Sequence, residues 1–113
     1  MRAANKNKEY AMILVLANIE ATTDGIDAMK AAIKTMETAS QAEPGCISYR
    51  FTQELSHPEK MVVVEQWESV AALVDHFGMP HMAAFGEAMA ANPPKSVDAK
   101  MYELGPAQDL PGR

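Results

Sequence analysis

The sequence has little of what several classes of protein depend on. Its 113 residues include one cysteine, Cys46, so no internal disulfide can form and an oxidising compartment is not implied. Its 10 Lys and Arg residues are outnumbered by 15 Asp and Glu residues, which provides no positive surface for nucleic acid or anionic membranes. No apolar run approaches the roughly 20 residues that a membrane helix needs. These absences favour an acidic, soluble domain in a cytoplasmic setting, without nucleic-acid or membrane partners.

Motifs for cofactors and nucleophiles are also missing. The chain has no G-x-G-x-x-G, no P-loop and no nucleophile elbow, so nothing in it indicates a nucleotide, a flavin or a serine hydrolase. His76 and His81 are five residues apart, which does not place them on one helical face, and Pro80 interrupts the helix between them. His57 lies in a distant loop. The spacing of acids and histidines therefore predicts no dedicated metal site.

The hydrophobic residues, 48% of the chain, are spaced in a way that predicts regular structure. Residues 10–19 are almost continuously apolar over a strand-like length, which is typical of a strand covered on both faces. A helix follows, with Asp24 as its N-cap and residues 43–45 (Glu-Pro-Gly) as its stop. Its apolar stripe consists of Ile26, Met29, Ile33 and Met36.

The second half of the chain predicts a hairpin, two helices and a last strand. Residues 46–54 alternate in polarity and residues 61–67 are rich in β-branched side chains, as in a hairpin. Ser69 is a plausible N-cap for a short helix, which Gly78 and Pro80 end before another helix begins. The stripe of the short helix is Val70, Leu73, Val74 and Phe77, and the last strand covers residues 96–104.

The resulting order, βαββααβ, is the split βαβ plan of α+β, ferredoxin-like domains with an antiparallel sheet. We expect one domain over residues 9–105, with loose tails at 1–8 and 106–113. The strands around Val15 and Val63 are apolar on both faces, although the helices can cover only one face of the sheet. A symmetric homodimer that packs sheet against sheet would bury the second face. The alternative is a monomer whose second face is half buried.

A few polar or aromatic residues are candidates for a site, each with a structural alternative. His76 borders the stripe of the short helix, and an imidazole with an ordinary pKa of about 6.5 can accept a proton near neutrality. It could equally be an exposed histidine or a helix cap. Trp67 is either a core anchor or part of a pocket, and Asn18 is either a satisfied structural amide or a pocket donor. Cys46 is most simply a small buried thiol.

Two stretches carry a resemblance to a known family. "EPGC" before a strand, followed by "VVVEQWESVAALVDHFGMPHMAAF", resembles the antibiotic biosynthesis monooxygenase domain, and most closely the small bacterial quinol monooxygenases. The resemblance spans about residues 10–105. It implies a dimeric α+β barrel that oxygenates a quinol or similar dihydroxy-aromatic with O2, without flavin, haem or metal. It also places Asn18, Trp67 and His76 at the family's pocket positions and His81 in the family's turn.

The sequence departs from several branches of that family. Members that tailor aromatic polyketides carry an asparagine where this chain has Val63, and "MAAFGEAM" lacks the axial histidine of the haem-degrading branch. We predict a cofactor-free monooxygenase with His76, Asn18 and Trp67 as catalytic residues. The predicted substrate-binding residues are His81, Tyr49, Phe51 and Phe77. The alternatives are a noncatalytic dimer that binds a hydrophobic or quinone-like molecule, and an isomerase on the same scaffold.

Overall fold

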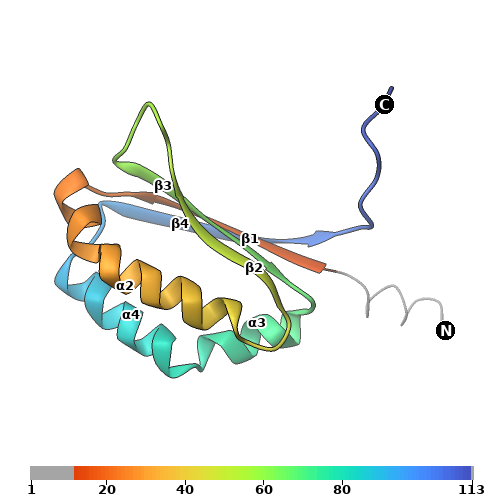
Figure 1. The fold of residues 1–113 in the computed structure, drawn as a ribbon, viewed down its shortest axis with the longest axis horizontal. Helices are drawn as coiled ribbons and strands as arrows, with labels where there is room; N and C mark the ends of the chain where they lie inside the picture. Colours follow the sequence, from red (N-terminus) through yellow and green to blue (C-terminus); the bar gives the residue numbers. More distant parts are fainter. Residues whose placement is uncertain (1–11, 113) are drawn as a thin grey trace.

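The computed structural model describes residues 12–112 and follows the predicted order of elements (Figure 1). The predicted N-terminal tail, residues 1–8, and the first three residues of the predicted domain lie outside the described residues. The elements are β1 (Met12–Glu20), α2 (Thr23–Gln41), β2 (Cys46–Gln53), β3 (Lys60–Trp67), α3 (Val70–Phe77), α4 (Pro80–Ala91) and β4 (Ser96–Leu104). Residues 105–112 contain no helix or strand. No helix within residues 12–112 is both long and apolar enough to cross a membrane.

The strands form one antiparallel sheet in the order β2-β3-β1-β4. All three helices lie on the same side of this sheet, so one face is covered and the other is open (Figure 1). This arrangement confirms the predicted α+β, ferredoxin-like plan. We call the covered side the inner face and the open side the outer face.

The core lies between the inner face and the helices. Alternation along β1 and β3 buries one parity of each strand, and Trp67, at the end of β3, is fully buried. The core cluster consists of Ile13, Ala17, Met36, Tyr49, Val63, Trp67 and Leu73. A register shift between Cys46 and Ser48 lies at the start of β2, and Ile47, which the alternation predicts to face the core, is exposed.

The outer face carries the opposite parity of the same strands. Leu14 and Leu16 of β1 and Val62 and Val64 of β3 are only half buried, and Leu16 pairs with Val64. The edge strand β4 is exposed along nearly its whole length. This face has the apolar character from which the homodimer is predicted, and the dimer stays a prediction.

Two details at the helices differ from the sequence prediction. Thr22, not Asp24, is the N-cap of α2, because its hydroxyl accepts the Gly25 N–H at 2.9 Å; Asp24 lies within the first turn. Ser69 caps α3 as predicted, accepting from Ala72 N–H at 3.1 Å. The buried residues of α3 are nevertheless Leu73 and His76, and the predicted stripe is otherwise exposed. The helix is therefore rotated so that His76, expected at the edge of the apolar stripe, faces the core.

Candidate functional site

The Glu-Pro-Gly-Cys stretch forms a tight turn that fixes Glu43. Pro44 and Gly45 are its central residues, and the Cys46 N–H donates to the Glu43 carbonyl at 3.1 Å. Gly45 has φ of 84°, which a type II turn requires at this position and which glycine adopts without strain. The turn follows α2 directly, since the Glu43 N–H donates to the Ser40 carbonyl at 3.0 Å. Glu43 is consequently held between the end of α2 and the start of β2.

The same turn is packed tightly against α3. A Cβ atom on Gly45 would lie 2.6 Å from the Cβ of Ala72, so only glycine fits there without displacing the helix. The Glu68 N–H also donates to the Gly45 carbonyl at 2.8 Å, which joins the turn to the end of β3. These contacts bring the Glu43 carboxylate to the end of α3, although the two segments are distant in sequence.

The break between α3 and α4 brings His76 and His81 together. Gly78 caps α3, Met79 is the N-cap of α4, and Pro80 occupies the first turn of α4, where a missing N–H costs nothing. The chain changes direction here, and the two imidazole rings lie with their centroids 6.0 Å apart. The five-residue spacing was expected to separate the histidines. It does not, because the helix break, and not a single helical face, determines where they lie.

Both histidines bind the same carboxylate oxygen. Glu43 Oε2 lies 2.7 Å from Nδ1 of His76 and 2.5 Å from Nε2 of His81. The side chains of His76 and Glu43 are 1% and 4% exposed, whereas that of His81 is 17% exposed. The other carboxylate oxygen, Glu43 Oε1, is buried and has no hydrogen-bond partner in the described chain. His81 is therefore the member of the trio that a ligand from outside would meet first.

The shared oxygen also fixes the tautomers of the two rings. An ionised carboxylate can only accept, so His76 must donate from Nδ1 and His81 from Nε2. In the neutral rings this leaves lone pairs on Nε2 of His76 and Nδ1 of His81. The trio can thus take up a proton at either free nitrogen while Glu43 stabilises the resulting imidazolium.

Aromatic side chains and a second buried acid surround His76. Its ring centroid lies 4.7 Å from that of Trp67 and 5.4 Å from that of Tyr49. Trp67 donates from Nε1 to Oε1 of Glu65 at 3.0 Å, so its indole N–H is satisfied within the core. Burial raises the pKa of Glu65, and the Trp67 hydrogen bond and the nearby His76 oppose that rise.

The thiol and phenol of this region are held in their neutral forms. Burial, with the nearby Glu43 and Glu65 adding to it, raises the pKa of Cys46 to about 11. Burial and the same two carboxylates also raise the pKa of Tyr49 well above its ordinary value. Neither group supplies an anion at neutral pH, so Tyr49 can act here only as a neutral hydrogen-bonding group.

A row of aromatic rings leads from this site to an apolar cavity. Ring centroids are 5.9 Å apart for Tyr49 and Phe51 and 5.5 Å apart for Phe51 and Phe85. The cavity beyond them has a volume of about 50 Å³. Its lining includes Ile19, Ile26, Met29, Ile33, Phe51, Met61, Phe85 and Met89. Three of these residues, Met29, Met61 and Met89, have flexible thioether side chains, which suits a cavity that adapts to its ligand.

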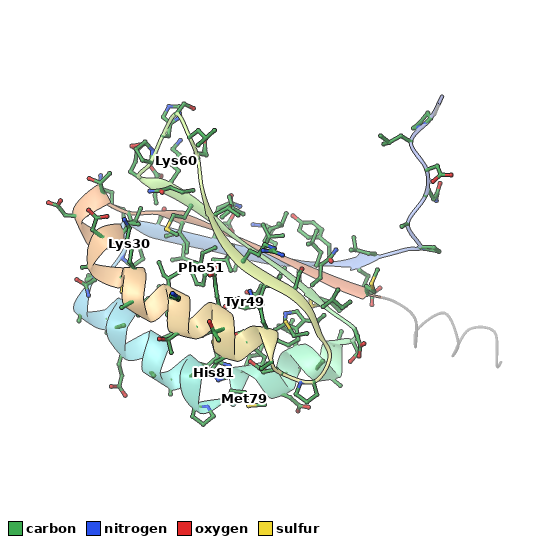
Figure 2. All side chains as sticks on the ribbon, in the orientation of Figure 1. Lys30, Tyr49, Phe51, Lys60, Met79 and His81 are labelled. Atoms are coloured by element: carbon green, nitrogen blue, oxygen red, sulfur yellow. The ribbon has the colours of Figure 1, made fainter. Side chains whose placement is uncertain are left out.

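His81 also borders a groove on the surface between α2 and α4. This groove is lined by Ala31, Ala32, Thr35, Met36, His81, Ala84 and Phe85. Phe85 contributes to both the groove and the apolar cavity. Figure 2 shows His81 near the α3–α4 corner and Tyr49 and Phe51 on β2.

Five of the predicted site residues lie together in this region, Phe77 lies at its exposed edge, and Asn18 lies elsewhere. His76, His81, Trp67 and Tyr49 are neighbours, and Phe51 is the next ring along. Asn18 is exposed on the outer face, because it alternates with the buried Ala17 and pairs with Val62 and Asp98. The ring of Phe77 is next to His76, but the residue is 59% exposed.

Sequence reasoning missed both buried acids. The sequence pattern assigns Glu43 only to a helix stop, although an acid followed by Pro-Gly at a turn also indicates that its side chain is held in one place. Glu65 shares the parity of Met61, Val63 and Trp67, so the alternation already placed a carboxylate among core positions. A charge at a core position is uncommon and signals a partner or a function.

Comparisons with known proteins agree with one another. The family model "Antibiotic biosynthesis monooxygenase" matches residues 12–88. The protein sll1783 of Synechocystis, described as uncharacterised, is 32% identical over 98 residues, which cover 87% of this chain and 67% of that protein. The "Probable quinol monooxygenase YgiN" of Escherichia coli is 50% identical over 32 residues, only 28% of this chain and 31% of that protein.

Solved structures share the same fold. Rv0793 of Mycobacterium tuberculosis is 26% identical with a TM-score of 0.73, over 87% of this chain and 97% of that one. A protein of Deinococcus radiodurans is 20% identical with a TM-score of 0.80, over 88% of this chain and 99% of that one. The second likeness concerns the fold alone.

Proposed function

Because the chain belongs to the antibiotic biosynthesis monooxygenase family, we propose that it oxidises a quinol or related dihydroxy-aromatic with O2, without flavin, haem or metal. The observation that carries this proposal is the buried trio of Glu43, His76 and His81 beside an aromatic row. Such a site combines a proton acceptor with surroundings from which water is largely excluded. The description of the E. coli relative as a quinol monooxygenase supports the choice of substrate class.

The chemistry needs no reductant besides the substrate. Removing a proton from a quinol gives an electron-rich anion, which can transfer an electron directly to O2. One oxygen atom then enters the ring and the other leaves as water, while the quinol becomes a hydroxyquinone. The ring C–H bond and the quinol each supply two electrons, so the four electrons that O2 requires are accounted for. The protein has only to bind the ring, accept the proton and keep the site dry.

The described residues suit these tasks. His81 accepts the phenolic proton on Nδ1, since it is the least buried member of the trio and its other nitrogen is held by Glu43. Glu43 fixes the tautomer and stabilises the imidazolium, and His76 shares the charge from the buried side. Phe51 and Phe85 offer ring faces to a flat substrate, and the buried Tyr49 and Trp67 pack behind His76 and hold its ring in place. The apolar cavity has to widen, because about 50 Å³ is too small for a bicyclic quinol.

The active unit in this proposal is a homodimer. A partner sheet on the outer face would cover the half-buried Leu16 and Val64 and the β4 side chains of the same parity. Asn18 would then lie at the subunit interface. Its predicted catalytic role would require that it act from that position, because its own sheet separates it from His76.

Oxygen uptake with a panel of naphthohydroquinones, corrected for autoxidation and run in chelator, tests the proposal. Wild type should increase uptake, and His81→Ala should lower kcat by about 10² to 10⁴, the usual range for a positioned acid–base group. His57→Ala is the matched control, because His57 is an exposed histidine in the β2–β3 loop. Uptake unchanged by wild type would favour a noncatalytic binder. A requirement for added flavin or metal would contradict the cofactor-free mechanism.

A further inference from the structure

The trio of Glu43, His76 and His81 has a second chemical property besides proton transfer. One ligand atom from each of the three residues lies within 4.8 Å of the other two. The three residues come from the α2–β2 turn, the end of α3 and the start of α4. Their positions are therefore fixed by several elements of the fold, and they do not share a single flexible loop. Two imidazole nitrogens and one carboxylate oxygen are ligands that zinc and other divalent first-row ions prefer.

A further observation is the second oxygen of Glu43. Oε1 is buried and lacks a hydrogen-bond partner among the described residues, which is costly for a carboxylate oxygen. The ion pairs found in residues 12–112 link Glu43 to the two histidines and to no lysine or arginine. A divalent ion would neutralise this carboxylate and could use its unsatisfied oxygen as well.

We propose that Glu43, His76 and His81 form a site for a divalent transition-metal ion such as Zn²⁺, and that the bound ion inhibits turnover. The site supplies three protein ligands and leaves at least one coordination position open on the side of His81, the less buried residue. Binding of the ion does not depend on the function proposed above, whereas the inhibition rests on it.

The distances are compatible with an ion after a small movement. Zinc bonded to each ligand at about 2.1 Å would hold the ligand atoms roughly 3.4 Å apart. Glu43 Oε2 now lies 2.7 Å and 2.5 Å from the two nitrogens, as expected when protons, and not an ion, join them. Lengthening each oxygen–nitrogen distance to that value takes a movement of less than about 1 Å, and the three ligand atoms already lie within 4.8 Å of one another.

Inhibition follows from the tautomers. A metal ion needs the lone pair of Nε2 in His81, so the proton of that nitrogen must move to Nδ1. Nδ1 is the atom that would accept the phenolic proton, and in the metal-bound ring it carries a hydrogen instead. The ring cannot serve as a metal ligand and as the base in the same molecule.

Direct binding is measured by competition between the apo-protein and a chromophoric zinc indicator. We expect one Zn²⁺ per chain. Glu43→Gln and His81→Ala should each lower the affinity for Zn²⁺ at least about 100-fold, which exceeds the loss typical of substitutions at residues that only hydrogen-bond to metal ligands. His57→Ala and Cys46→Ser should bind as wild type does, since neither residue belongs to the trio. Absence of stoichiometric binding, or a loss that is as large in His57→Ala, would overturn the site.

Two further measurements keep the proposal testable if a variant fails to fold. Co²⁺ bound to wild type should give the intense visible absorption of a low-coordinate ion, and a spectrum equal to that of aqueous Co²⁺ would contradict the site.

Zn²⁺ should inhibit quinol oxidation at the concentration at which it binds, and chelator should reverse the effect. Activation by the metal would refute the inhibition. Zinc binding without oxidase activity would remove the proposed function alone, and activity without zinc binding would remove the metal site alone.

Discussion

Replacing Gly45 with alanine tests whether the Glu-Pro-Gly-Cys turn positions Glu43 as described. Two separate costs are expected. A side chain at φ of 84° costs about 1–2 kcal/mol relative to ordinary backbone. The new methyl group would also lie 2.6 Å from Ala72 Cβ, and relieving such a contact in a packed region costs typically about 1–3 kcal/mol.

The sum, about 2–5 kcal/mol, is a large part of the roughly 5–15 kcal/mol by which small domains are stable. Urea unfolding should therefore show a lower midpoint with an unchanged slope. In the Gly45→Ala background, Ala72→Gly should recover the stability lost to the Cβ–Cβ contact and leave the loss caused by the backbone angle φ. The substitution Ala72→Gly itself costs about 1 kcal/mol in helix propensity, which the wild-type background measures separately. This double-mutant cycle separates the two costs.

The matched control is Gly86→Ala in the interior of α4. A Cβ atom there meets nothing within 4 Å, and its backbone is helical, so the substitution should stabilise the protein by about 0.5–1 kcal/mol. If Gly45→Ala were as stable as wild type, or if Ala72→Gly restored none of the loss, the account of the turn and of how it holds Glu43 would be refuted.

Three other predictions follow from single features. Alkylation of Cys46 at pH 8 should be roughly 10-fold slower than in the unfolded chain. Raising the pKa from 9.0 to about 11 leaves about 100-fold less thiolate, although that thiolate is about 10-fold more nucleophilic; equal rates would contradict the shift. Thr22→Ala should cost about 1 kcal/mol in thermal unfolding and Asp24→Ala less, and the reverse order would make Asp24 the cap. Light scattering at micromolar concentration should give twice 12.3 kDa, and Val64→Lys should shift the protein towards monomer; a wild-type monomer would exclude the dimer.

The fold was predictable because its signals are local. Apolar runs and alternation located all four strands, and the punctuation by Ser69, Gly78 and Pro80 located the boundary between α3 and α4. One error lies where two residues compete for one role, as Thr22 and Asp24 do for the cap of α2. Local sequence patterns cannot identify which of the two residues is the N-cap, because that depends on the residue at which the chain enters the helix.

The site was predictable only in part because its geometry is not local. The sequence identifies His76 and Trp67 as candidates. The burial of His76, however, depends on the rotation of α3, and the apolar Val74 and Phe77, which are exposed, indicate the wrong buried face. Glu43 reaches His76 across 33 positions of the chain, a contact that no periodicity encodes. Asn18 is a predicted site residue because it is a polar residue within an apolar strand. The alternation along β1, however, points its side chain to the outer face, away from His76.

The fully buried Trp67 makes the protein its own optical probe. It is the single tryptophan of the chain, so all indole emission comes from the position where its ring lies 4.7 Å from that of His76. The emission should be blue-shifted, as for an indole without water contact, and sensitive to the charge on the neighbouring imidazole. Quinol binding, metal binding and the proton state of His76 could then be followed by fluorescence in an unlabelled sample, in real time and without turnover.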